Sequence, residues 1–173
     1  GATQMRHLRC EVQTGPFGSQ LHAEDYVDDG WPVINPMNIV SGALRDDDAK
    51  RVGDEKRREL SRHILFPGDI VFGRRGEMGR AGLVSPEQAG WLCGTGCLRI
   101  RLSDSRLQPN YLKMLLETGP ARDYFSLSSV GSTMENLNSE ILLSLPIVLP
   151  DVGEQSRIVE RVTAERCRSS EVR

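Results

Sequence analysis

Residues 68–84 read Gly68-Asp69-Ile70-Val71-Phe72-Gly73-Arg74-Arg75-Gly76-Glu77-Met78-Gly79-Arg80-Ala81-Gly82-Leu83-Val84, and this stretch carries the sharpest signal in the sequence. After a Pro-Gly turn, residues 69–72 carry β-branched and aromatic side chains, which favour a strand. Leu83 and Val84 begin a returning strand. Because four glycines and three arginines lie within residues 73–82, the stretch predicts a long β-hairpin with a charged, glycine-rich tip.

The tip of this hairpin is the sharpest functional signal in the sequence. Glycines let a backbone approach a surface closely, and arginine forks reach phosphates or the edges of bases. We therefore expect Arg74, Arg75 and Arg80 to contact DNA phosphates or a groove. The alternative is a flexible, solvated hairpin, since loops are usually polar.

Further strands are predicted on both sides of the hairpin. A short one lies around Val33-Ile34, and two more lie at residues 91–93 and 97–102. In the last of these, Leu98, Ile100 and Leu102 share one face and Arg99 and Arg101 share the other. We expect the arginine face to be the exposed side of a half-buried strand, with DNA contact as the alternative.

Helices are predicted near the end of the chain. Pro109 suits the first turn of one helix, which carries Tyr111 and Leu112. Asp151 with Glu154 resembles the capping box that opens a second helix. That helix has one apolar stripe and needs a partner surface, so we expect these residues to pair with another helix or to dock a partner: Val152, Ile158, Val159 and Val162.

The charge of the chain limits how it could bind nucleic acid. Among 173 residues, 22 basic side chains are balanced by 24 acidic ones, giving a net charge of −2, and 19 of the 22 bases are arginine. A free-standing, tight, non-specific DNA binder should be strongly basic. Binding through a local concentration of charge is still compatible with this net charge, while the arginine bias itself is more readily explained by the codon usage of a GC-rich genome.

Other residues are weaker candidates for DNA contact. The bases between residues 50 and 57 most often form only a solvated face, and the glycine- and proline-rich turn at residues 14–20 is more readily structural. The weaker candidates are Lys50, Arg51, Lys56, Arg57, Ser19, Gln20 and Thr133.

Catalytic and metal-binding motifs are missing from the sequence. It has no phosphate-binding loop, no nucleophile elbow and no zinc-protease motif. Four cysteines and three histidines lack the paired spacing of a zinc site. We expect no cofactor, no metal and no catalysis, although a triad assembled only in three dimensions stays open. No apolar run has the length of a membrane span, so we expect a cytoplasmic protein without membrane contact.

Six pieces in order along the chain resemble the target-recognition domain of the specificity (S) subunit, HsdS, of type I restriction–modification systems. They are residues 14–21 (Thr-Gly-Pro-Phe-Gly-Ser-Gln-Leu), 30–39 (Gly-Trp-Pro-Val-Ile-Asn-Pro-Met-Asn-Ile), 68–72 with 74–76 and 79–80, 109–112 (Pro-Asn-Tyr-Leu), 131–133 with 136–138, and 145–147 with 149–150, 154–155 and 158.

The resemblance implies an α+β fold: a twisted β-sheet recognition domain with peripheral helices over residues 1–150, then the start of a long helix over 151–173 that pairs as an antiparallel coiled coil. It implies a non-catalytic subunit that reads one half of a bipartite target in double-stranded DNA. A full S subunit has two such domains and two long helices, whereas this chain has one domain and the start of one helix.

The resemblance also implies partners. The methyltransferase (M) subunit binds S-adenosylmethionine and methylates adenine, and the restriction (R) subunit joins through the complex. A homodimer or a second half-subunit would complete the recognition unit. Two alternatives stay open: a scaffold that holds a methyltransferase without reading DNA, and a small enzyme.

Overall fold

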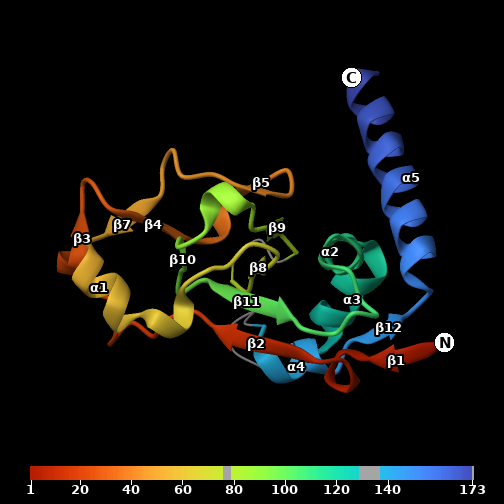
Figure 1. Ribbon diagram of the computed structural model, residues 1–173, viewed down its shortest axis with the longest axis horizontal. Helices are drawn as coiled ribbons and strands as arrows, with labels where there is room; N and C mark the ends of the chain where they lie inside the picture. Colours follow the sequence, from red (N-terminus) through yellow and green to blue (C-terminus); the bar gives the residue numbers. More distant parts are fainter. Residues whose placement is uncertain (76–78, 129–136, 173) are drawn as a thin grey trace.

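The computed structural model describes residues 1–75, 79–128 and 137–172, and its main sheet has four antiparallel strands in the order β2-β11-β8-β9 (Figure 1). The predicted hairpin is confirmed: β8 pairs with β9, and β11 runs along the other side of β8. The strands are β2 (Cys10–Thr14), β8 (Ile70–Gly73), β9 (Ala81–Leu83) and β11 (Cys97–Leu102).

One face of the main sheet carries the largest core. Ile70, Phe72, Leu98 and Ile100 are buried there beneath helices, and the Phe72 ring centroid lies 5.5 Å from that of Phe125. The alternation of apolar residues along β8 and β11 produces this face, because successive side chains of a strand point to opposite sides. The helices over it are α2 (Pro109–Leu116), α3 (Gly119–Ser128) and α4 (Ser139–Leu143).

A second sheet lies at the end of the molecule away from α5 (Figure 1). Its order is β10-β4-β7-β3, and β10 runs parallel to β4. A separate two-stranded hairpin follows β4 in the chain. The elements are β3 (Tyr26–Val27), β4 (Trp31–Ile34), β5 (Ile39–Val40), β6 (Ala43–Leu44), β7 (Lys50–Val52), α1 (Asp54–Glu59) and β10 (Leu92–Cys93), with 3₁₀ turns η1 (Met5–His7), η2 (Ala23–Asp25), η3 (Pro36–Asn38), η4 (Ser61–His63) and η5 (Pro86–Gln88).

The arginine face of β11 is covered, so the expectation of an exposed strand face was wrong. Only 1% of Arg99 is exposed, and its guanidinium pairs with Glu11. Arg101 donates from Nε and Nη2 to Asp69 at 2.9 and 2.8 Å and stacks 4.0 Å above the Phe66 ring. Residues 62–66 close over this face, because the backbone carbonyls of Arg62 and Ile64 both accept from these arginines.

Close backbone approach joins the two sheets. A Cβ at Gly15 would lie 1.8 Å from the Gly94 carbonyl oxygen, and a Cβ at Gly94 would lie 2.4 Å from Asn35 Oδ1. The Gly94 amide donates to the Ile34 carbonyl at 2.8 Å. Three segments distant in sequence therefore cross where only glycine fits, which gives the Cys93–Cys97 loop a structural role.

The first strand of the described chain lies beside the strand that precedes α5. Strand β1 (Ala2–Gln4) pairs with β12 (Pro146–Val148), and α5 (Val152–Glu171) begins directly after it. Asp151 caps α5 by accepting from the Glu154 amide at 2.9 Å. The Glu154 side chain bonds Arg157 instead of closing the predicted capping box.

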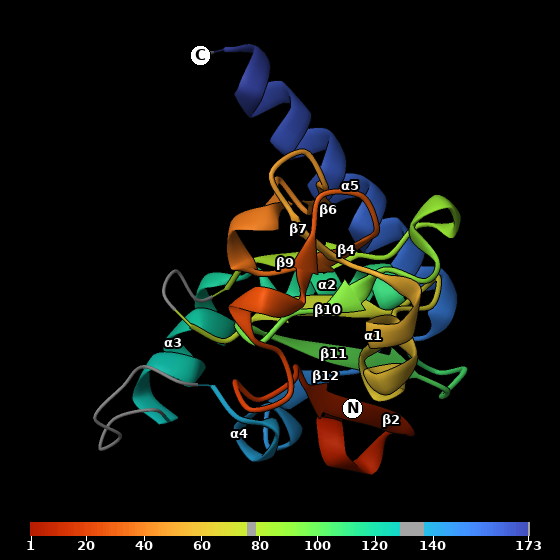
Figure 2. The same ribbon diagram turned by 90° about the vertical axis from the view of Figure 1, so that its left-hand side faces the viewer.

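A buried amide fastens α5 to the body of the molecule. Gln155 is fully buried, donates from Nε2 to the carbonyls of Arg106 and Pro150 at 2.7 and 2.8 Å, and accepts from the Gln108 amide at 2.9 Å. Ile158, Val159 and Val162 then pack against the chain's own main core. Beyond them α5 extends away from the body in both views (Figures 1 and 2).

In the described ranges, no helix combines the length and apolar character needed to cross a membrane.

Candidate nucleic-acid interface

Arg74 braces the base of the hairpin tip. Its backbone carbonyl accepts from the Leu137 amide at 3.1 Å, and its side-chain Nε donates to the Leu137 carbonyl at 3.1 Å. Burial lowers the pKa of this guanidinium. Two of the predicted motif pieces, around residues 74 and 137, therefore meet in space, and Arg74 holds them together.

Arg75 and Arg80 differ in how exposed they are. Arg75 is exposed at the tip. Arg80 is half-buried, and its Nη1 donates to the carbonyls of Pro36 and Ile39 at 3.2 and 3.3 Å. Arg80 therefore fixes the β5–β6 hairpin against the β8–β9 hairpin, which makes the two hairpins one continuous surface. Gly76, between them in sequence, lies outside the described residues.

The four bases between residues 50 and 57 all interact with their own domain, at the end of the molecule away from α5 (Figure 1). A hydrogen bond to Glu59 raises the pKa of Lys56. Two of the four, Arg51 and Lys56, are paired with carboxylates, so part of the positive charge of this group is compensated. Lys50 lies 4.8 Å above the Tyr26 ring, Arg51 pairs with Asp46 and donates to the Gly30 carbonyl, Lys56 pairs with Asp25 and Glu59, and Arg57 stacks 4.1 Å above Trp31 and donates to the Gly90 carbonyl.

The remaining candidates lie in loops. Ser19 and Gln20 are exposed, and Gln20 Oε1 accepts from the Phe17 amide at 2.9 Å, which holds the turn closed. The same turn leaves 65% of Phe17 exposed. Thr133 lies outside the described residues. The structure thus brings Arg74, Arg75 and Arg80 together and leaves the other candidates elsewhere.

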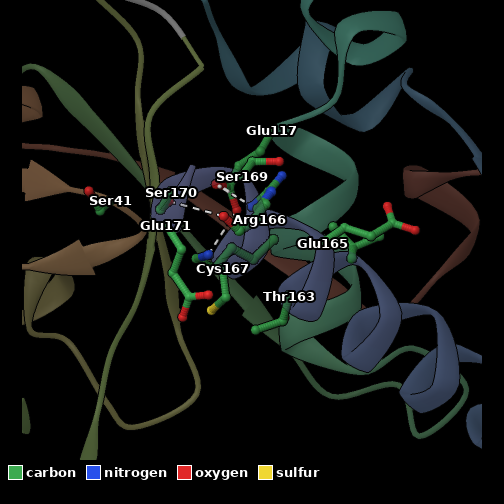
Figure 3. A pocket seen from close by; sticks show the side chains of 11 residues that line it. Ser41, Glu117, Thr163, Glu165, Arg166, Cys167, Ser169, Ser170 and Glu171 are labelled. Carbon is green, nitrogen blue, oxygen red and sulfur yellow. Dashed lines mark hydrogen bonds and ion pairs between the residues drawn. The ribbon is translucent and has the colours of Figure 1, made fainter. Parts of the chain in front are cut away.

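Two grooves flank the β5–β6 hairpin on the side of α5. The larger, about 960 Å³, runs between the second half of α5 and Lys113 and Glu117 at the end of α2, with Arg166 near its centre (Figure 3). The smaller, about 550 Å³, lies between the hairpin, Arg80, Arg122 and Arg166. The two grooves share Ser41, Glu117 and Arg166.

Sequence reasoning missed Arg122 and Arg166. The two residues are 44 positions apart in the sequence, in α3 and α5. Each lies among polar residues that suggest only an exposed helix face. Nothing local in the sequence marks them, because only the packing of α3 and α5 around the hairpin brings them to one groove.

Metal and thiol chemistry finds little support in the described part of the chain. Residues 1–75, 79–128 and 137–172 contain no group of three or more His, Cys, Asp or Glu side chains that could hold a metal ion. Cys93 and Cys97 are buried and unpaired, and burial raises the pKa of the Cys93 thiol to about 12. A thiol held in its neutral form is a poor nucleophile.

Comparison with known proteins identifies a family. The model of the type I restriction modification DNA specificity domain matches residues 10–164. The specificity subunit of the type I restriction enzyme EcoEI from Escherichia coli is 24% identical over 140 residues, which cover 78% of this chain and 23% of that protein. The EcoKI specificity subunit from Escherichia coli is 27% identical over 139 residues, covering 77% and 30%. The chain thus spans about a quarter to a third of these relatives.

Solved structures share the fold. A chain from a study of assembly and conformational transition of a type I R-M system superposes with a TM-score of 0.74 at 15% identity, over 99% of this chain and 39% of that one. The HsdS subunit from Thermoanaerobacter tengcongensis gives a TM-score of 0.66 at 15% identity, over 99% and 38%. These likenesses confirm the mixed α+β fold with twisted sheets. Since the family model spans most of the chain, the predicted resemblance is confirmed: the chain belongs to the type I restriction modification DNA specificity domain family.

Proposed function

We propose that the chain is a non-catalytic DNA-recognition module of a type I restriction–modification complex, reading one half of a bipartite target in double-stranded DNA. The observation that carries this proposal is the family match over residues 10–164, which includes both sheets, both hairpins and the anchored part of α5. The relatives it resembles are specificity subunits of type I restriction enzymes.

The geometry supports reading by hairpins. Exposed Arg75 and the adjoining β5–β6 hairpin lie on one surface that Arg80 joins. A two-stranded ribbon fits the major groove of B-DNA, and exposed Met37 and Val40 beside the turn offer apolar contact to thymine methyl groups. Arg74, Lys50, Arg51, Lys56 and Arg57 fit supporting roles better than base reading, because each holds part of its own domain.

Partners complete the proposal. The near-neutral charge suits a reader that gains part of its affinity from a methyltransferase subunit, with the restriction subunit joining the complex. We propose that α5 docks this subunit or pairs, antiparallel, with a second half-subunit or copy. Since Ile158, Val159 and Val162 pack on the domain itself, Val152, which is 40% exposed, and the polar half of α5 are the surfaces that remain for contact.

The test is to map methylated adenines genome-wide, with and without the gene for this chain, and to measure duplex binding by the chain assembled with the methyltransferase. We expect loss of one bipartite methylation motif and salt-sensitive binding that favours duplexes containing it. Equal affinity for all duplexes in the assembled complex, with methylation retained, would instead favour a scaffold that does not read DNA.

A further inference from the structure

The smaller groove is built from four parts of the chain that are distant in sequence. The β5–β6 hairpin forms one wall, Gly79 to Ala81 form the floor, and Arg122 of α3 and Arg166 of α5 approach from the helices. The turn of the hairpin, Ser41-Gly42, has φ values of 51° and 80°. Positive φ at both central residues suits a two-residue hairpin turn, and Val40 and Ala43 pair directly across it.

The charge of this groove is positive. Its described lining has three guanidinium groups, on Arg80, Arg122 and Arg166, and one carboxylate, on Glu117. Lys113 Nζ already donates to that carboxylate at 2.8 Å, and Arg166 lies 3.4 Å from its second oxygen. Two cations therefore share one anion, which leaves net positive charge at the groove.

Arg122 is the least committed of these groups. Within residues 1–75, 79–128 and 137–172, no hydrogen bond or ion pair engages its guanidinium. A Cβ at Gly79 would lie 3.4 Å from Arg122 Nε, and Gly79 has a φ of 100°. A Cβ at that distance would make an ordinary van der Waals contact, so the guanidinium lies directly against the loop at residues 79–81.

The larger groove next to it has the opposite charge. Glu117, Glu165 and Glu171 line it with Lys113 and Arg166, so its carboxylates outnumber its cations (Figure 3). A polyanion would be repelled there and attracted by the smaller groove. Charge therefore distinguishes two cavities that share the Glu117–Arg166 pair.

We propose that the smaller groove binds a backbone phosphate of the DNA, with Arg122 and Arg166 as the contacting side chains. The proposal rests on the proposed DNA-reading function and adds a site to it: the helices clamp the backbone while the hairpins face the bases. Guanidinium forks suit phosphate oxygens, and such contacts fix register without carrying sequence information.

The experiment measures binding of a fluorescein-labelled duplex to the full chain, alone and assembled with the methyltransferase, across a salt series. In Arg122→Gln/Arg166→Gln, the slope of log K against log salt should fall by about 0.9 for each lost phosphate contact. Arg168→Gln is the matched control: it removes one arginine from α5 at a position that lines neither groove. Its slope should equal that of the wild type.

The outcomes distinguish failure of the groove proposal from failure of the DNA-reading function on which it rests. An unchanged slope in the double variant, with a lower one in Arg75→Gln, would overturn the groove and keep the DNA-reading function. An equal fall per arginine in Arg168→Gln would also overturn the groove, since the loss would then follow net charge alone. Absence of duplex binding by the wild type in either form would overturn both proposals.

Discussion

The two arginines of strand β11 and two arginines of the smaller groove, Arg122 and Arg166, have the same side chain in opposite surroundings. Arg99 and Arg101 lie under the segment at residues 62–66, bound to Glu11 and Asp69. Arg122 and Arg166 lie on helices and line a groove, and Arg166 shares Glu117 with Lys113 while Arg122 has no described ion pair. The comparison shows that an arginine count alone overstates the charge that a chain can present to DNA, because some of the arginines hold the fold together.

Of the substitutions at the arginines of β11, Arg101→Ala should lower the free energy of unfolding most. The Asp69 side chain is only 3% exposed and would keep the Phe66 amide as its one remaining described donor. Removing one partner of a buried pair leaves an uncompensated charge, so we expect a loss of about 3 kcal/mol in the free energy of unfolding. Urea denaturation measures it; a loss below about 1 kcal/mol would mean that water reaches Asp69.

Replacing Arg99 should change the stability of the protein through the loss of side-chain volume more than through the loss of charge. In the described part of the chain its Nε and Nη1 have no hydrogen-bond partner, and its one carboxylate partner, Glu11, is largely exposed. Arg99→Ala should cost about 2 kcal/mol through the cavity it opens. Arg99→Met fills the space without orphaned donors and should stay within about 1 kcal/mol of the wild type. Equal losses in the two variants, by the same urea titration, would show that the charge itself is needed.

His63 should make the inner cluster sensitive to acid. It is 5% exposed, and burial, with Arg99 and Arg62 nearby, lowers its pKa from 6.5. The unfolded chain therefore binds a proton that the folded chain resists, so stability should fall as pH drops below the unfolded value. His63→Gln should flatten the dependence of the melting temperature on pH between about 5 and 7. Exposed His22→Gln is the control, and an equal flattening there would contradict the assignment.

Arg122→Ala should give the smallest effect on stability. Its guanidinium contributes no described hydrogen bond or ion pair to the fold, so the unfolding free energy should change by no more than about 0.5 kcal/mol. Thermal denaturation beside the wild type measures it. A loss as large as that of Arg101→Ala would contradict the distinction between the arginines of β11, which hold the fold, and those that line the groove.

Local pattern predicted much of the fold. The hairpin at residues 68–84, the strand at 97–102, the helix from Pro109 and the Asp151 cap all follow from turn chemistry and alternation. The cover over Arg99 could not be predicted in this way. It depends on a segment more than 30 positions earlier folding back onto the strand, and alternation says which residues share a face but not what lies over it.

The candidate site was less predictable than the fold. The tip arginines stood out because glycine and arginine cluster in ten consecutive residues. Arg80, however, holds the neighbouring hairpin through two carbonyls, and Arg122 and Arg166 come together only through helix packing. Residue type and loop position identified the region of the candidate site. Which side chains face a ligand there depends on how distant parts of the chain pack together.

The pairing of β1 with β12 has a consequence for evolution. Ala2 lies opposite Val148, so the segment between them begins and ends at adjacent points, next to the start of α5. A segment whose two ends lie side by side can be exchanged as a unit, or circularly permuted, without displacing the helix that follows it.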